Sequence, residues 1–98
     1  MAEVDVLDPA TVDASLAEGL AWERQGGQIV KTHRGKDFAE ALAYVNAVGA
    51  LAEEVNHHPD IEISWNVVTL RLSTHSAGGI TQLDLDLARR IDALPPSG

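Results

Sequence analysis

The spacing of apolar and polar residues changes several times along the chain, and each change predicts a new element. Asp8-Pro9 is typical of a helix start, with the aspartate as the N-cap and the proline in the first turn. A thin apolar stripe follows at helical spacing, which predicts a short helix that ends near Gly19. Residues 21–25 and 28–33 flank Gly26-Gly27, a pair that tolerates positive φ angles and therefore predicts a tight hairpin.

The middle of the chain carries the longest helical pattern. Residues 37–40 resemble a helix start, with an aspartate cap and a carboxylate three positions later. The apolar stripe that should pack on a sheet consists of Phe38, Ala41, Leu42, Val45, Val48, Ala52 and Val55. Gly49 lies beside this stripe, where a close backbone contact would explain its cost of about 1 kcal/mol relative to alanine. Because Pro59 disfavours helical geometry at His58, the helix should end near Asn56.

Two later stretches alternate with a period of two, which predicts half-buried strands joined by a turn near Asn66. Their apolar positions are Ile61, Ile63 and Trp65 in the first, and Val68, Leu70 and Leu72 in the second. After a flexible loop at 75–79, Thr81 caps a last helix that ends at Pro95-Pro96. The order α-β-β-α-β-β-α predicts an α+β fold, with a four-stranded antiparallel sheet of two hairpins covered on one face by helices.

Length and composition place the chain among single globular domains. It has 98 residues, of which 45% are hydrophobic, and we expect residues 1–98 to form one domain with 1–7 and 95–98 loose. A formal net charge of -8, with only seven Lys and Arg, opposes direct binding to nucleic acid or to anionic membranes. Cysteine is absent, which fits a reducing compartment, and the acidic N-terminus lacks a signal pattern. The predicted location is therefore the cytoplasm.

Candidate chemistry gathers in the segment Glu53–Pro59 and at His75. Histidine titrates near pH ~6.5, so His57, His58 and His75 are suited to general acid and base catalysis. The long helix ends at His57 and a strand ends at His75, and the predicted topology opens both positions at one edge of the sheet. Each residue also has a purely structural reading, since His57-His58-Pro59 fits a helix stop and His75 fits a solvated strand end.

Other reaction classes fit the residues less well. Adjacent histidines point in different directions, and the chain has neither cysteine nor a His-x-x-x-His spacing, so no metal site is expected. A Ser-His-Asp triad through Ser64, Ser73 or Ser76 would lack the usual nucleophile elbow. Gly78-Gly79 lacks the remaining pattern of a phosphate-binding loop.

The intervals between the candidate residues resemble the signature of the pterin-4a-carbinolamine dehydratases. Glu53 is followed after three residues by His57-His58-Pro59, after five by Trp65, after nine by His75 and after eight by Asp84. The resemblance extends to Trp22, Lys36-Asp37-Phe38 and Leu72-Ser73-Thr74-His75, and covers roughly residues 12–94. Asn56 departs from the family pattern, because some members carry an aspartate there that would place a charge beside His57.

The resemblance implies an enzyme, a 4a-hydroxytetrahydrobiopterin dehydratase of the hydro-lyase class. It implies dehydration of 4a-hydroxytetrahydropterin to the quinonoid dihydropterin in tetrahydrobiopterin recycling, with no metal and no bound cofactor, by a homotetramer built from dimers. The implied catalytic residues are His57, His58 and His75, of which we take His57 and His75 as the acid–base pair. The implied substrate-binding residues are Glu53, Asn56, Trp22, Trp65, Ser73, Thr74, Ser76 and Asp84.

Two further readings remain open at the level of the sequence. One is a non-enzymatic binding or dimerisation module on the same fold, and the other is a related hydratase-like enzyme that acts on another pterin. A helix cap alone would also account for Asp84, and core packing would account for Trp22 and Trp65.

Overall fold

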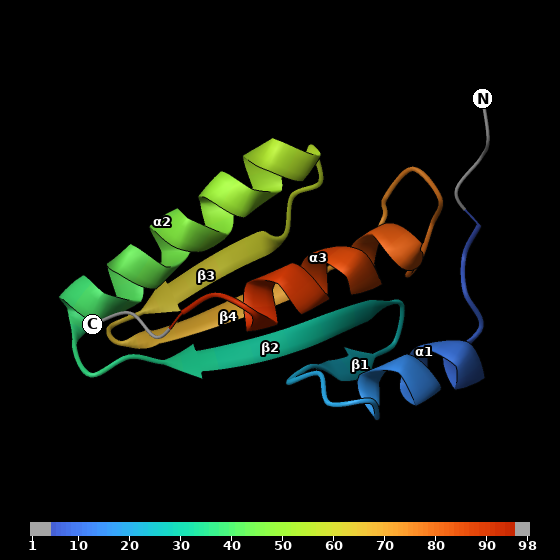
Figure 1. Ribbon diagram of the computed structural model, residues 1–98, viewed down its shortest axis with the longest axis horizontal. Helices are drawn as coiled ribbons and strands as arrows, with labels where there is room; N and C mark the ends of the chain where they lie inside the picture. Colours follow the sequence, from blue (N-terminus) through green and yellow to red (C-terminus); the bar gives the residue numbers. More distant parts are fainter. Residues whose placement is uncertain (1–4, 96–98) are drawn as a thin grey trace.

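The computed structural model describes residues 5–95 and has two layers, a sheet and the helices on one of its faces (Figure 1). The elements are α1 (Pro9–Leu16), β1 (Glu23–Gln25), β2 (Gln28–Arg34), α2 (Phe38–Val55), β3 (Asp60–Ser64), β4 (Val67–Leu72) and α3 (Gln82–Asp92). The four strands pair antiparallel in the order β1-β2-β4-β3, and α2 and α3 lie side by side over the sheet. The predicted α+β fold and order of elements are confirmed.

The helix starts that the sequence predicts are built as expected. The Asp8 carboxylate accepts the Thr11 N–H at 2.7 Å, and the Asp37 carboxylate accepts the Glu40 N–H at 2.9 Å. These bonds satisfy N–H groups that have no partner inside a helix, which sets where α1 and α2 begin.

The second hairpin turns at residues 65–66, as predicted near Asn66, but Trp65 does not belong to the strand. Ser64 pairs with Val67, so Trp65 is a turn residue with a φ of 54°, and its side chain is 67% exposed instead of continuing the strand. Asn66 fixes this turn, because its side-chain N–H donates to the Gly35 carbonyl oxygen at 2.7 Å. The predicted strand is therefore present as β3 but does not extend to Trp65.

The buried face of α2 differs from the predicted stripe. Its buried residues are Ala41, Tyr44, Val48 and Ala52, whereas Phe38, Leu42 and Val55 are 43%, 42% and 36% exposed. The helix is rotated so that Tyr44 packs toward the sheet, where its ring stacks on His33 of β2 with centroids 3.7 Å apart. The predicted close contact at Gly49 is wrong within the chain, since a Cβ there would meet nothing within 4 Å.

The ends of the chain were predicted to be loose. Residues 1–4 and 96–98 lie outside the described residues, but Leu7 is held in place because its N–H donates to the Ile80 carbonyl oxygen at 2.8 Å. Leu7 also packs against the core cluster. Between residues 5 and 95, the structure contains no helix with the length and apolarity needed to cross a membrane.

A single carboxylate joins the end of α3 to the sheet. Asp92 accepts hydrogen bonds from the Ala21 N–H at 2.8 Å, the Trp22 Nε1–H at 2.9 Å and the Lys31 ammonium at 2.6 Å. We call these four residues the Asp92 junction. The Lys31 and Asp92 side chains are only 14% and 16% exposed, so this ion pair is largely shielded from water.

Candidate active site

The end of α2 sets the position of His57. Asn56 takes the left-handed conformation, with a φ of 54°, which asparagine tolerates better than most residues. The turn lets the His57 N–H reach back to the Ala52 carbonyl oxygen at 3.1 Å. The helix therefore ends through an asparagine cap, and Pro59 acts only on the chain beyond it.

His57 contacts a fully buried carboxylate. Its Nε2 lies 2.5 Å from Asp84 Oδ1, and the two side chains are 13% and 0% exposed. The other oxygen, Asp84 Oδ2, accepts the Thr81 N–H at 2.8 Å and the Thr74 hydroxyl at 2.9 Å. Asp84 also completes the capping box of α3, where the helix dipole favours negative charge. One carboxylate thus caps a helix and orients an imidazole.

His75 follows Thr74 directly, which places it at the same end of the sheet as His57. It is exposed, in the turn that the bridge between Thr74 and Gly79 closes. Ser76 is exposed in the same turn. The topology therefore puts the predicted acid–base pair on two chain segments that meet at Asp84.

His58 has a carboxylate partner of its own. Its Nε2 lies 2.5 Å from Glu53 Oε2, one turn back on α2, and the side chains are 52% and 79% exposed. Exposed pairs of this kind contribute at most about 1 kcal/mol, because water screens them. His58 and Glu53 are therefore placed as an outward-facing pair beside His57.

The side chains of three predicted substrate-binding residues have partners outside this group. The Ser73 hydroxyl donates to the Gly27 carbonyl oxygen at 3.0 Å, and Trp22 belongs to the Asp92 junction. Trp65 stacks on Phe38 with ring centroids 6.3 Å apart, at the opposite end of α2 from His57. An 18-residue helix is about 27 Å long, so neither this aromatic pair nor the chain near it reaches the histidines.

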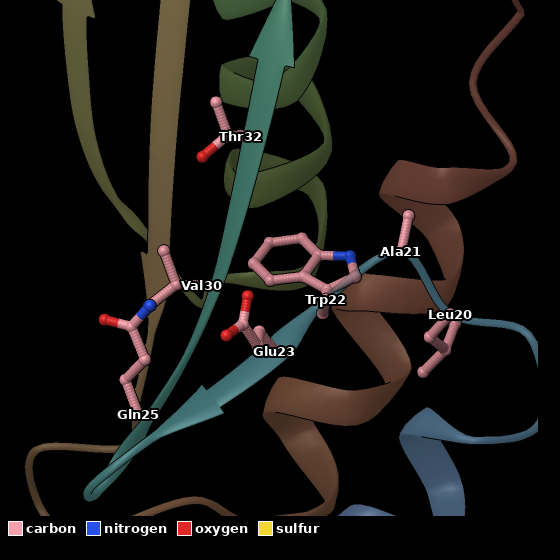
Figure 2. A pocket seen from close by; sticks show the side chains of 7 residues that line it. All are labelled: Leu20, Ala21, Trp22, Glu23, Gln25, Val30 and Thr32. Atoms are coloured by element: carbon pink, nitrogen blue, oxygen red, sulfur yellow. The ribbon is translucent and has the colours of Figure 1, made fainter.

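A cavity of about 340 Å³ lies beside Trp22 rather than beside the histidines. Its lining residues are Leu20, Ala21, Trp22, Glu23, Gln25, Val30 and Thr32. Figure 2 shows the Trp22 indole at its rim, between the start of β1 and the strand β2. This cavity is therefore separate from the candidate active site.

A separate group of side chains around His33 lies on the helix side of β2. His33 stacks on Tyr44 with ring centroids 3.7 Å apart and contacts the Glu40 carboxylate at 3.2 Å. Burial raises the pKa of Tyr44 to about 12, and the nearby charges of Asp92 and Glu40 add to the effect. The phenol therefore stays protonated at neutral pH and is a poor candidate for proton transfer there.

One role could not be predicted from the sequence. Thr81 was assigned only to a helix cap, although its hydroxyl lies 2.7 Å from the Thr74 hydroxyl, beside Asp84. A threonine at each end of the 74–81 loop was the available signal.

In the part of the chain that the structure describes, no group of three or more His, Asp or Glu side chains is arranged to hold a metal ion.

Comparison with known proteins identifies related sequences over most of the chain. Residues 5–94 match the family model described as pterin 4 alpha carbinolamine dehydratase. A protein of Thermomicrobium roseum is 53% identical over 88 residues, which are 90% of this chain and 95% of that protein. A protein of Roseiflexus sp. (strain RS-1) is 48% identical over the same shares of the two chains. Both are provisionally named pterin-4-alpha-carbinolamine dehydratase.

Solved structures share the fold. The transcriptional coactivator/pterin dehydratase of Brucella melitensis superposes with a TM-score of 0.85 at 29% identity, over 96% of this chain and all of that chain. A pterin dehydratase-like protein described as a RuBisCO assembly factor in the alpha-carboxysome has a TM-score of 0.62 at 25% identity. The latter comparison covers 81% of this chain and 92% of the assembly factor.

Proposed function

Because this chain belongs to the pterin-4-alpha-carbinolamine dehydratase family, we propose that it dehydrates 4a-hydroxytetrahydropterin to the quinonoid dihydropterin. The observation that carries the proposal is the contact of His57 with the buried Asp84, next to Thr74 and His75. General acid–base catalysis needs proton-transfer groups held in place around one substrate, and this end of the sheet supplies them.

The chemistry needs one proton delivered and one removed. The bond between C4a and the hydroxyl oxygen breaks, and the oxygen leaves as water after it gains a proton. The ring nitrogen beside C4a loses its proton as the new double bond forms. His57 and His75 are the proposed acid–base pair, and each such transfer contributes typically 10²- to 10⁴-fold to the rate. His58, held by Glu53, is proposed to orient the substrate.

A stopped-flow assay on synthetic 4a-hydroxytetrahydropterin tests this proposal. We expect the wild-type protein to accelerate dehydration well beyond the buffer rate, in proportion to protein concentration. The same assay on other pterin hydrates would define the substrate. If the folded protein left the buffer rate unchanged, the enzymatic proposal would be wrong.

A second candidate function is a protein-binding module on the same fold. It is supported by the structural relative that is described as a RuBisCO assembly factor. The buried pair of His57 and Asp84 favours the enzyme, since a carboxylate that orients an imidazole serves proton transfer better than surface recognition. A protein without turnover that recovers a specific partner in a pulldown would favour the module.

Self-association is part of the proposal. Phe38, Leu42 and Ile61 leave an apolar surface over α2 and β3, with each side chain about two-fifths exposed. Gly49, seven positions after Leu42 on the same face, leaves room for the backbone of a second helix. This surface is proposed to bind a second copy of the chain, on the way to the tetramer that the family resemblance implies.

Sedimentation velocity measures this association directly. We expect the wild type to sediment as a dimer or tetramer, and Leu42→Glu to shift it toward the monomer because a charge would have to be buried. Ala43→Glu, at an exposed position next to it, is the control. A monomeric wild type at micromolar concentration would contradict the proposal.

The remaining expectations belong to the same proposal. Tetrahydrobiopterin recycling is supported by the family, and a single domain over residues 1–98 agrees with the family match to 5–94. The cytoplasmic location stays a prediction that rests on the absence of cysteine.

A further inference from the structure

Two buried threonine hydroxyls form a chain of hydrogen bonds that ends on Asp84. Thr74 and Thr81 are 5% and 0% exposed, and their Oγ1 atoms are 2.7 Å apart. Thr74 Oγ1 also lies 2.9 Å from Asp84 Oδ2, and Thr81 Oγ1 accepts the Leu83 N–H at 3.2 Å. These bonds tie the end of β4 to the start of α3, directly behind His57.

The protons in this chain have only one consistent arrangement. Each hydroxyl has a single proton to donate. Thr74 donates to the Asp84 carboxylate, so it accepts in its bond with Thr81, and Thr81 must donate. The Thr74 hydroxyl and the Thr81 N–H then both donate to Asp84 Oδ2. Such an arrangement suits an ionised carboxylate, which accepts hydrogen bonds and donates none.

An ionised Asp84 fixes which nitrogen of His57 carries the proton. Oδ1 can only accept, so His57 Nε2 must be the donor across their 2.5 Å contact. The second ring nitrogen, Nδ1, is then left free of Asp84 on a side chain that keeps a 13% exposed fraction. A substrate can therefore exchange a proton only with Nδ1.

We infer that Thr74 and Thr81 are positioning residues that act through Asp84 to hold His57 as its Nε2–H tautomer, so that Nδ1 is the atom that exchanges a proton with the substrate. The use of Nδ1 rests on the proposed dehydratase function. The tautomer of His57 does not depend on that function, because it follows from hydrogen bonds inside the free protein. The two parts can therefore be tested separately.

The tautomer can be measured on the free protein from the NMR shifts of its imidazole nitrogens. In the neutral imidazole of His57, we expect the wild type to show a protonated Nε2 and an unprotonated Nδ1. In Asp84→Asn, the Thr81 N–H and the Thr74 hydroxyl hold the amide oxygen, so the amide NH2 faces His57 and the tautomer reverses. Reversal of this kind in a histidine–carboxylate pair lowers kcat by up to about 10⁴-fold.

The threonine is tested by Thr74→Val, which keeps the shape and removes the hydroxyl, with Thr74→Ser as the conservative rescue. We expect the valine variant to show a mixture of tautomers and a roughly tenfold lower kcat with KM unchanged, and serine to restore both. A wild-type tautomer in Asp84→Asn, or wild-type kcat and tautomer in Thr74→Val, would overturn the inference. If the tautomers behave as expected while the wild type lacks dehydratase activity, only the proposed function and the use of Nδ1 fail.

Discussion

Replacement of His57 with glutamine is expected to lower the rate of pterin dehydration by about 10²- to 10⁴-fold, the usual contribution of one acid–base group. Glutamine is close to histidine in size and can still hydrogen-bond to Asp84, but it cannot exchange a proton near neutral pH. The loss should appear in kcat measured by stopped flow on the synthetic carbinolamine. The fold should survive, because the Asn56 turn and the His57 backbone bond to Ala52 do not use the side chain.

The matched control is His33→Gln, the same change at a histidine outside the candidate site. His33 packs on Tyr44 on the helix side of β2, so its replacement should affect stability slightly and leave kcat near the wild-type value. If His57→Gln kept more than a tenth of the wild-type kcat, His57 would not belong to the acid–base pair, and His58 and His75 would become the candidates.

The largest loss of stability is expected from Asp92→Ala. The substitution leaves the Lys31 ammonium and the Trp22 Nε1–H without their carboxylate partner in a largely buried place. Loss of one partner of a buried ion pair costs about 3 kcal/mol or more in the free energy of unfolding. For a domain of this size that loss lowers the melting temperature by roughly 12–24 °C, which calorimetry or thermal circular dichroism would detect.

The control for this experiment is Asp86→Ala on the same helix. Asp86 is 61% exposed and contacts Gln82 and Arg89 at the surface, so its removal should change the unfolding free energy by less than about 0.5 kcal/mol. Equal melting temperatures for the two variants would mean that the Asp92 junction does not hold α3 to the sheet.

The order of elements could be predicted because it depends on local chemistry. Asp8, Asp37 and Thr81 cap helices through bonds to residues two or three positions away, and Gly26 supplies the positive φ of a hairpin. Such signals lie within a few residues of one another. They therefore survive in the sequence without any knowledge of the tertiary structure.

The buried face of α2 could not be predicted in the same way. Tyr44 and Val48 face the core, whereas Phe38 and Leu42 fit the same helical period and remain exposed. Periodicity shows that a helix is amphipathic, but the rotation of the helix depends on the elements packed against it. Here the rotation brings Tyr44 onto His33 of β2 and leaves Phe38 and Leu42 exposed.

Only part of the candidate site could be predicted from the sequence. The predicted topology placed His57 and His75 at one edge of the sheet, and in the structure His57 and Thr74, the neighbour of His75, both contact Asp84. The hydrogen-bond partner of Trp22 could not be predicted, because Asp92 lies 70 positions away and no local pattern marks it. The resemblance implied that Trp22 and Trp65 bind the substrate, whereas Trp22 packs in the core and Trp65 lies in a turn.

The double use of Asp84 has a consequence for how this protein can evolve and be redesigned. In many enzymes the residues of the site reduce stability, so that selection for a firmer fold and selection for a faster reaction oppose each other. The buried carboxylate of Asp84 caps the start of α3 and also contacts His57. Selection for stability and selection for the reaction would therefore both favour an aspartate at this position. Serine or asparagine would serve the helix alone, but neither would place a carboxylate against His57.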